Sequence, residues 1–198
     1  MSHSYISSSL KQSLECLQRF LENPEQINRI QKSVELMTNT LKRDGRILAC
    51  GNGGSMCDSL HFVEELTGRY RKDRTPLSAL SMGEAGHLTC VGNDYGFDFI
   101  FSRMVEAHGR KGDTLLAIST SGNSTNIIKA IEAAHKKEVH VVALLGKDGG
   151  KIKSLLKPND VGIIVDHSIT DRIQEVHIKI IHIIIEGIER HLFPDHYA

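Results

Sequence analysis

Residues 46–55 read RILACGNGGS, a short apolar run that ends in a glycine-rich turn, and this pattern decides the fold. Four more apolar runs follow it, at residues 77–80, 114–118, 140–145 and 161–165. Helical patterns separate most of them, at residues 56–66, 97–107, 126–135 and 151–155. Continuous apolar strands that alternate with helices predict a parallel sheet covered on both faces, because right-handed crossovers place helices on each side.

Helices are expected at both ends of this pattern. Apolar side chains recur three and four residues apart in two N-terminal segments, at Leu10, Leu14, Leu17 and Leu21 and at Ile27, Ile30, Val34, Met37 and Leu41. We expect residues 1–45 to belong to the same domain as residues 46–198 and to contribute contacts between subunits. A long last helix is expected from Ile173 to Leu192, with a capping box of Ser168 and Asp171 at its start. The prediction is a single α/β domain.

Composition narrows the classes of function. The 24 Lys and Arg are balanced by 24 Asp and Glu, which argues against a nucleic-acid partner because such surfaces carry a basic excess. The longest apolar stretch, at residues 180–185, is far too short to span a membrane. The four cysteines form no CxxC pair and residues 1–10 do not resemble a signal peptide. We therefore expect a cytoplasmic protein that binds neither nucleic acid nor membrane.

Ligands of a doubly wound sheet bind beyond the carboxyl ends of the strands, so the loops there are the candidate site. The first loop contains Asn52, Gly53, Gly54 and Ser55 ahead of a helix. Glycines let the backbone approach a ligand, and N–H groups at a helix start attract anions. The spacing matches neither a Walker A loop nor a dinucleotide fingerprint, so nucleotide binding is not supported. A plain tight turn is the alternative.

The loop after the third strand is rich in hydroxyl groups. Residues 119–125 read STSGNST and precede a helix. The hydroxyls and the helix N–H groups would form a neutral cradle for a phosphate, without a basic residue. Helix capping is the alternative, but one cap needs one hydroxyl and this loop offers several.

His61 and Glu65 are four residues apart and share a helix face, whereas Glu64 is rotated about 60° the other way from His61, so Glu65 is the better partner. Such a pair can hold a metal or act as acid and base, with an ordinary surface pair as the alternative. His182 lies in an apolar stretch of the last helix, where a buried histidine is the usual interpretation. On pattern alone, Arg69 is interpreted as a surface charge. We interpret two further segments as simple turns: residues 92–94 (GND) and residues 146–150 (GKDGG).

These segments together resemble the sugar isomerase (SIS) domain of the phosphoheptose isomerase family, from the N-terminal helices to near Phe193. The motifs are CGNGGS at residues 50–55, HFVEELTGRY at 61–70, CVGNDYGF at 90–97, ISTSGNS at 118–124, GKDGG at 146–150 and DRIQEVHIKIIH at 171–182. ISTSGNS alone would indicate only an SIS domain, whereas EELTGRY and DRIQEVH point to the heptose enzymes.

The resemblance implies a five-stranded parallel sheet and a homotetramer with active sites at subunit interfaces. It implies an aldose–ketose isomerase that converts sedoheptulose 7-phosphate to D-glycero-D-manno-heptose 7-phosphate through an enediol, at the start of heptose synthesis for lipopolysaccharide or capsule. The phosphate would bind at Ser119, Thr120, Ser121 and Ser124, and the sugar at Asn52, Gly53, Gly54, Ser55, Glu65, Arg69, Asn93, Asp94, Asp171 and Gln174. Glu65 and His182 would be the catalytic pair, and His61, Glu65, Gln174 and His182 would bind one Zn²⁺ per subunit.

Two considerations bear on these implications. Gln174 and His182 are separated by about 12 Å of helix rise, so their side chains would have to converge to share one metal. A non-catalytic SIS module that senses a sugar phosphate or binds a protein is the alternative function, but the presence of both Glu65 and His182 favours the enzyme. A dinucleotide-binding or flavodoxin-like protein fits the α/β pattern but lacks the fingerprint.

Overall fold

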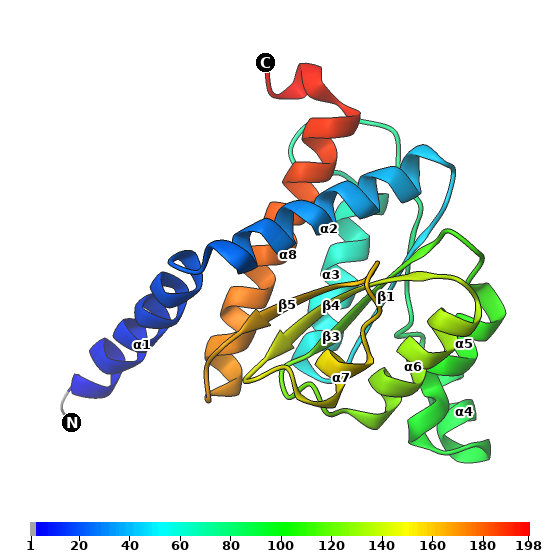
Figure 1. Ribbon diagram of the computed structural model, residues 1–198, viewed down its shortest axis with the longest axis horizontal. Coiled ribbons are helices and arrows are strands. Elements are labelled where there is room, and N and C mark those ends of the chain that lie inside the picture. Colours follow the sequence, from blue (N-terminus) through cyan, green and yellow to red (C-terminus); the bar gives the residue numbers. More distant parts are fainter. Residues whose placement is uncertain (1–2) are drawn as a thin grey trace.

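Five strands form one parallel sheet in the order β2-β1-β3-β4-β5 in the computed structural model, which describes residues 3–198 (Figure 1). The strands are β1 (Ile47–Gly51), β2 (Ala79–Ser81), β3 (Thr114–Ser119), β4 (His140–Gly146) and β5 (Val161–Val165). Both β1 and β3 are buried along their whole length, which explains why their sequences are continuously apolar rather than alternating. The predicted α/β fold and its five strands are confirmed, although β2 is short and begins two residues later than expected.

Helices cover both faces of this sheet (Figure 1). One apolar layer joins the sheet to α2 (Pro24–Lys42), α3 (Gly54–Thr67) and α8 (Thr170–Leu192). The other joins it to α4 (Ala85–Asp94), α5 (Ile100–His108), α6 (Thr125–Lys136) and α7 (Gly150–Leu155). Two short 3₁₀ helices, η1 (Phe97–Phe99) and η2 (Pro194–His196), complete the described elements. Among residues 3–198, no helix combines the length and apolarity needed to cross a membrane.

The N-terminal helix α1 (Ser4–Leu21) extends away from the rest of the molecule (Figure 1). Only Cys16 and Phe20 of this helix are buried. Its leucine stripe is exposed: Leu10, Leu14, Leu17 and Leu21 are 68%, 63%, 42% and 67% accessible. The apolar stripe of α2, in contrast, packs into the layer with α8 and β5.

Two local expectations were wrong. The segment at residues 92–94 is the last turn of α4, not a turn after an apolar run; Glu84 caps this helix by accepting hydrogen bonds from the N–H groups of Gly86 and His87. The capping box of Ser168 and Asp171 is absent, because α8 begins after Ile169 and no side chain caps it.

The strand order reverses beside β1, and this reversal positions the site. The chain leaves β1 into α3 on one face of the sheet and leaves β3 into α6 on the other. The loops after β1 and β3 therefore diverge at the carboxyl edge, which is where doubly wound sheets bind ligands.

Candidate active site

The loop after β1 is a tight turn that only glycine permits. A Cβ on Gly51 would lie 2.4 Å from the backbone oxygen of Ser55, and Gly53 has a positive φ of 54°. The turn brings the backbone of Gly53 and Gly54 to the start of α3, where no side chain caps the helix. The N–H groups of Ser55 and Met56 donate to the carbonyls of Asn52 and Gly53 at 3.0 Å within this turn, and the positive end of the helix dipole still attracts an oxygen-rich ligand to the glycine backbone.

An amide pair joins this loop to the start of α6. Asn52 Nδ2 donates to Asn126 Oδ1 at 2.9 Å, and Asn126 Nδ2 donates to Asn52 Oδ1 at 2.8 Å. Asn126 is buried and sits in the first turn of α6. Sequence reasoning missed Asn126, because a polar residue at a helix start carries no signal of its own. The pair locks the two candidate loops together.

The serine hydroxyls of the loop after β3 are not used to cap helix α6. Ser124 is the N-cap residue of α6, yet its side chain makes no capping hydrogen bond. Its hydroxyl instead lies 3.2 Å from that of Ser119, while Ser121 accepts a hydrogen bond from the N–H of Asn123 at 3.1 Å. Hydroxyl groups beside the uncapped N-terminus of a helix form a neutral anion cradle, so the geometry favours the phosphate interpretation over capping.

The GKDGG segment supports this cradle. Gly122 has a positive φ of 64°, and a Cβ there would lie 2.1 Å from the backbone oxygen of Gly149. The carbonyl of Gly122 accepts a hydrogen bond from Ile152 N–H at 3.0 Å, and Asn123 Oδ1 accepts one from Lys151 N–H at 3.1 Å. Residues 146–150 are therefore more than a simple turn, because they and the start of α7 fix the shape of the loop after β3.

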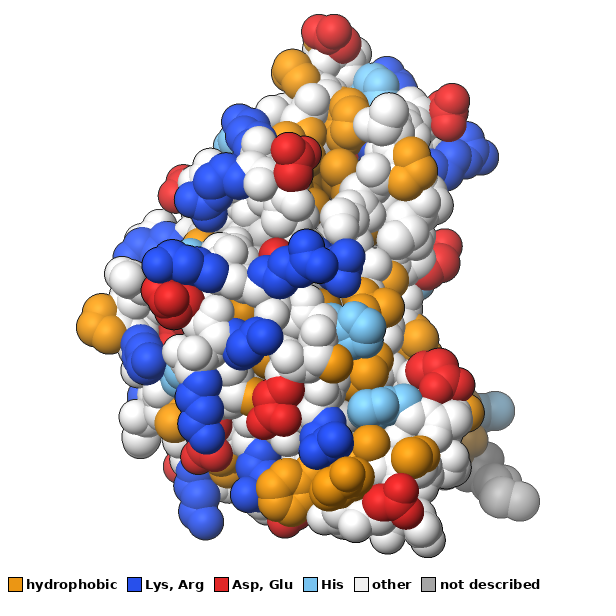
Figure 2. Space-filling view, turned by 90° about the vertical axis from the view of Figure 1, so that its right-hand side faces the viewer, with side chains coloured by type: hydrophobic (Ala, Val, Ile, Leu, Met, Phe, Trp, Pro, Cys, Tyr) orange, Lys and Arg blue, Asp and Glu red, His pale blue; other side chains and the backbone are white. Residues whose placement is uncertain are grey.

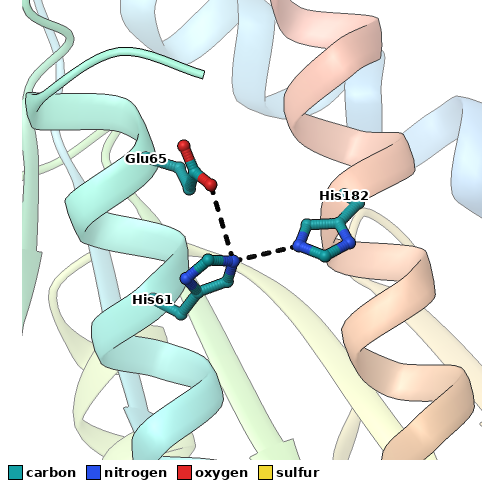
Figure 3. Close-up of side chains that lie close together, drawn as sticks. All are labelled: His61, Glu65 and His182. Carbon is teal, nitrogen blue, oxygen red and sulfur yellow. Dashed lines mark hydrogen bonds and ion pairs between the residues drawn. The ribbon is translucent and has the colours of Figure 1, made fainter. Parts of the chain in front are cut away.

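Three chemically active side chains converge between α3 and α8 (Figure 3). His61 Nε2 lies 2.9 Å from His182 Nε2 and 3.6 Å from Glu65 Oε1. Since two bare nitrogen lone pairs repel, a proton or a cation must lie between the two histidines at this distance. One ligand atom of each of the three residues lies within 4.8 Å of the others. Two imidazole nitrogens and one carboxylate oxygen match the protein ligands of a catalytic zinc site with a free position, so the donor set fits the metal.

Burial shifts the two outer groups of this cluster in opposite directions. Desolvation raises the pKa of Glu65, and the negative charge of Glu64 raises it further. Desolvation also lowers the pKa of His182, and the neighbouring His61 and Lys179 lower it further. Each group is thus held toward its neutral form relative to an exposed residue.

Two neighbours of the cluster were not predicted. Glu64 Oε2 lies 3.3 Å from His61 Nδ1, so the two carboxylates of α3 approach opposite nitrogens of one imidazole ring. Glu65 was predicted to be the better partner of His61, yet Glu64 also contacts the ring, because residues three apart on a helix are neighbours too. A carboxylate on the second nitrogen of a histidine fixes its orientation and tautomer. Tyr70 stacks on the ring of His182 with centroids 6.1 Å apart.

Gln174 lies at the other end of the α3–α8 contact. Its amide packs against Gly54, where a Cβ would lie 2.4 Å from Gln174 Oε1, and its Nε2 is 3.4 Å from Asp58 Oδ1. Within one subunit Gln174 therefore lies at the start of α3 with the glycine turn, and not with His61, Glu65 and His182.

Four other predicted residues are not brought to the cluster within one subunit. Asn93 and Asp94 are exposed on α4, where Asn93 donates to Asp94 at 2.8 Å. Asp171 is exposed at the start of α8 and lies 3.6 Å from Arg172. Arg69 is exposed in the segment after α3.

Known proteins share this architecture along almost the whole chain. The SIS domain family model matches residues 10–146. A phosphoheptose isomerase of Vibrio parahaemolyticus is 53% identical over 188 residues, which are 94% of this chain and 97% of the relative. The solved phosphoheptose isomerase of Neisseria gonorrhoeae is 44% identical with a TM-score of 0.89, covering 94% of this chain and 98% of that one. That of Francisella tularensis is 34% identical with a TM-score of 0.91, covering 96% and 99%. The chain therefore belongs to the phosphoheptose isomerase family of SIS-domain proteins.

Proposed function

We propose that this chain interconverts sedoheptulose 7-phosphate and D-glycero-D-manno-heptose 7-phosphate, the step that starts heptose synthesis for lipopolysaccharide or capsule. One observation carries the proposal. In a member of the phosphoheptose isomerase family, Glu65 and His182 converge between α3 and α8. The Asn52–Asn126 amide pair joins the turn at the start of α3 to the start of α6, where the hydroxyl loop lies. His61 lies about 10 Å along α3 from Gly54, which suits a long substrate held by its phosphate at one end.

The isomerisation moves one proton between C1 and C2 through an enediol. Glu65 takes the proton from C1 of the ketose and returns it to C2, while His182 moves a proton between the two oxygens. The raised pKa of Glu65 makes its carboxylate a stronger base, and the lowered pKa of His182 keeps the imidazole neutral and able to accept. The upward shift moves the pKa of Glu65 toward neutral pH, where acid–base catalysis is most efficient.

Substrate binding is assigned to the two loops and their surroundings. The phosphate binds Ser119, Thr120, Ser121 and Ser124, with the uncapped start of α6. The sugar binds Asn52, Gly53, Gly54, Ser55, Glu65, Arg69, Asn93, Asp94, Asp171 and Gln174. Energy from the distant phosphate positions C1 and C2 at the catalytic pair.

We further propose one Zn²⁺ per subunit, held by His61, Glu65 and His182. Such an ion supplies Lewis-acid stabilisation of the developing oxyanion. Gln174, the fourth ligand implied by the family resemblance, lies against Gly54 at the start of α3 and is not part of this set within one subunit. Zinc content measured on purified protein, with a His61→Ala variant that loses the metal, tests this assignment.

We propose a cytoplasmic homotetramer with active sites at subunit interfaces, in which residues 1–45 contribute the contacts. The exposed leucine stripe of α1 supports it, because isolated soluble chains rarely expose a continuous apolar row. Nucleic acid is not a proposed partner, because the 24 Lys and Arg of the chain are balanced by 24 Asp and Glu, and the face in Figure 2 carries side chains of both signs.

Incubation of the purified protein with sedoheptulose 7-phosphate, followed by NMR, tests the activity. We expect the aldose 7-phosphate to accumulate. Chemical-shift changes of the protein without any aldose, in the presence or absence of added zinc, would contradict the proposal and indicate a sugar-phosphate sensor.

A further inference from the structure

A fully buried ion pair joins α8 to the segment that follows α3. Arg74 Nε donates to Glu189 Oε1 at 2.8 Å, and both side chains are 0% exposed. The other carboxylate oxygen of Glu189 accepts a hydrogen bond from the Tyr197 hydroxyl at 2.8 Å. A buried charge needs partners that satisfy it, and this carboxylate has a donor on each oxygen.

The same guanidinium closes the end of α3. Arg74 Nη2 donates to the backbone oxygen of Glu65 at 2.7 Å, and Nη1 donates to those of Leu66 at 2.8 Å and Gly68 at 3.2 Å. Carbonyl groups in the last turn of a helix have no partner inside the helix. Arg74 supplies the missing donors, and one of them goes to the backbone of Glu65 itself.

The residues just before Arg74 extend this attachment along α8. Tyr70 stacks on His182, and Arg71 Nη2 lies 2.8 Å from Glu186 Oε2. His182 and Glu186 are one turn apart on the helix face that also carries the buried glutamate. The segment after α3 is thereby fastened to the same face of α8 that presents His182.

We propose that Arg74 and Glu189 are positioning residues that hold Glu65 at its working distance from His182 by fixing the end of α3 against α8. The inference rests on the roles proposed above for Glu65 and His182. Catalytic groups need placement within about 0.5 Å, which requires support from outside the site. Lysine cannot replace this arginine, because its single ammonium group cannot direct donors to the carboxylate and the carbonyls in the fixed geometry of a guanidinium.

Steady-state kinetics of Arg74→Lys and Glu189→Gln test the proposal. We expect kcat to fall by about tenfold to a hundredfold, because a small displacement of a catalytic group has effects of this size. KM should change little, since the phosphate cradle lies on the loop after β3 and the start of α6. Tyr197→Phe removes one hydrogen bond from Glu189 and keeps both charges, so we expect a smaller fall in kcat.

Asp160→Asn is the matched control. Asp160 lies 2.7 Å from His135, with side chains 4% and 10% exposed, and it precedes β5 at the opposite edge of the sheet. Its loss removes a buried pair without touching α3 or α8, so the melting temperature should fall while kcat stays near the wild-type value.

An unchanged kcat in the Arg74 and Glu189 variants, or an equal fall in the Asp160 control, overturns the proposal. If the first two variants do not fold, Tyr197→Phe decides alone, and an unchanged kcat there overturns it. Failure of the wild-type protein to isomerise sedoheptulose 7-phosphate would instead contradict the proposed function.

Discussion

The surroundings of Glu65 and His182 shift the pKa values of both groups away from those of exposed residues. Desolvation is the largest cause of both pKa shifts, and it acts upward on a carboxyl and downward on an imidazole. The spacing of His61 and Glu65 was readable from the sequence. Their meeting with His182 was not, because it depends on how α3 and α8 pack across more than a hundred residues of intervening chain.

The pH dependence of turnover follows from these shifts. Protonated Glu65 cannot accept the C1 proton, so kcat/KM should fall toward acid as Glu65 becomes protonated. Replacing Glu64 by Gln removes a negative charge that raises the pKa of Glu65, so this acid limb should move to lower pH. A pH–rate profile measures it, with exposed Glu132→Gln on α6 as the control. A Glu64→Gln profile that coincides with wild type would contradict the assignment of Glu65 as base.

The burial of His177 predicts that the stability of the fold depends on pH. Its ring is buried against the Leu145 carbonyl at 3.0 Å, and burial lowers its pKa to about 4. The unfolded chain binds this proton below about pH 6.5 and the folded chain does not, so stability is complete above pH 6.5 and is lost as the pH falls. At pH 5 the loss is about 2 kcal/mol.

Urea unfolding of wild type and His177→Gln at pH 7.5 and pH 5 measures this difference. The variant should lose less stability than wild type between the two pH values, whereas exposed His108→Gln should behave as wild type. Equal losses in wild type and His177→Gln would show that this ring is not protonated on unfolding.

Among the elements, the strands were the most predictable, because strands buried on both faces leave continuous apolar runs. Helix α4 was missed for a physical reason. Val91 is its only buried residue and two of its ten residues are glycine, so it carries no apolar stripe. The α4 cap, Glu84, is also outside the usual set of Ser, Thr, Asp and Asn.

A substitution of Ser124, at the start of α6, distinguishes a helix-capping role from a phosphate-binding role. Loss of a capping side chain costs about 1 kcal/mol, but Ser124 makes no capping bond. Ser124→Ala should therefore change the free energy of unfolding by less than about 0.5 kcal/mol while raising KM for the sugar phosphate. Urea unfolding and steady-state kinetics measure the two quantities. A loss of stability with unchanged KM would favour the capping interpretation.

At the scale of the whole molecule, the packing within one subunit does not account for the exposed apolar side chains of α1. Its leucines point to solvent, and several predicted sugar-binding residues lie apart from the cluster of His61, Glu65 and His182. The sequence analysis assigns subunit contacts to residues 1–45, but an apolar stripe predicts burial without saying which surface covers it.

A charge placed in this stripe tests the assembly. Leu14→Glu should dissociate the proposed tetramer into smaller species, since it would bury an unpaired carboxylate in the subunit contact. Light scattering coupled to gel filtration measures the mass, and Lys11→Glu, at an exposed position of the same helix, is the control. A wild-type mass equal to 22.0 kDa, that of one chain, would contradict the assembly directly.

The central claim is that Glu65 transfers the proton between C1 and C2. Its most direct test is NMR of sedoheptulose 7-phosphate with enzyme in deuterated water. Wild type should place deuterium on C2 of the aldose, because the base exchanges its proton with solvent. Glu65→Gln should still bind the sugar phosphate and yet lose about 10²- to 10⁴-fold in isomerisation and in deuterium incorporation. Isomerisation with deuterium incorporation at the wild-type rate in Glu65→Gln would contradict the account.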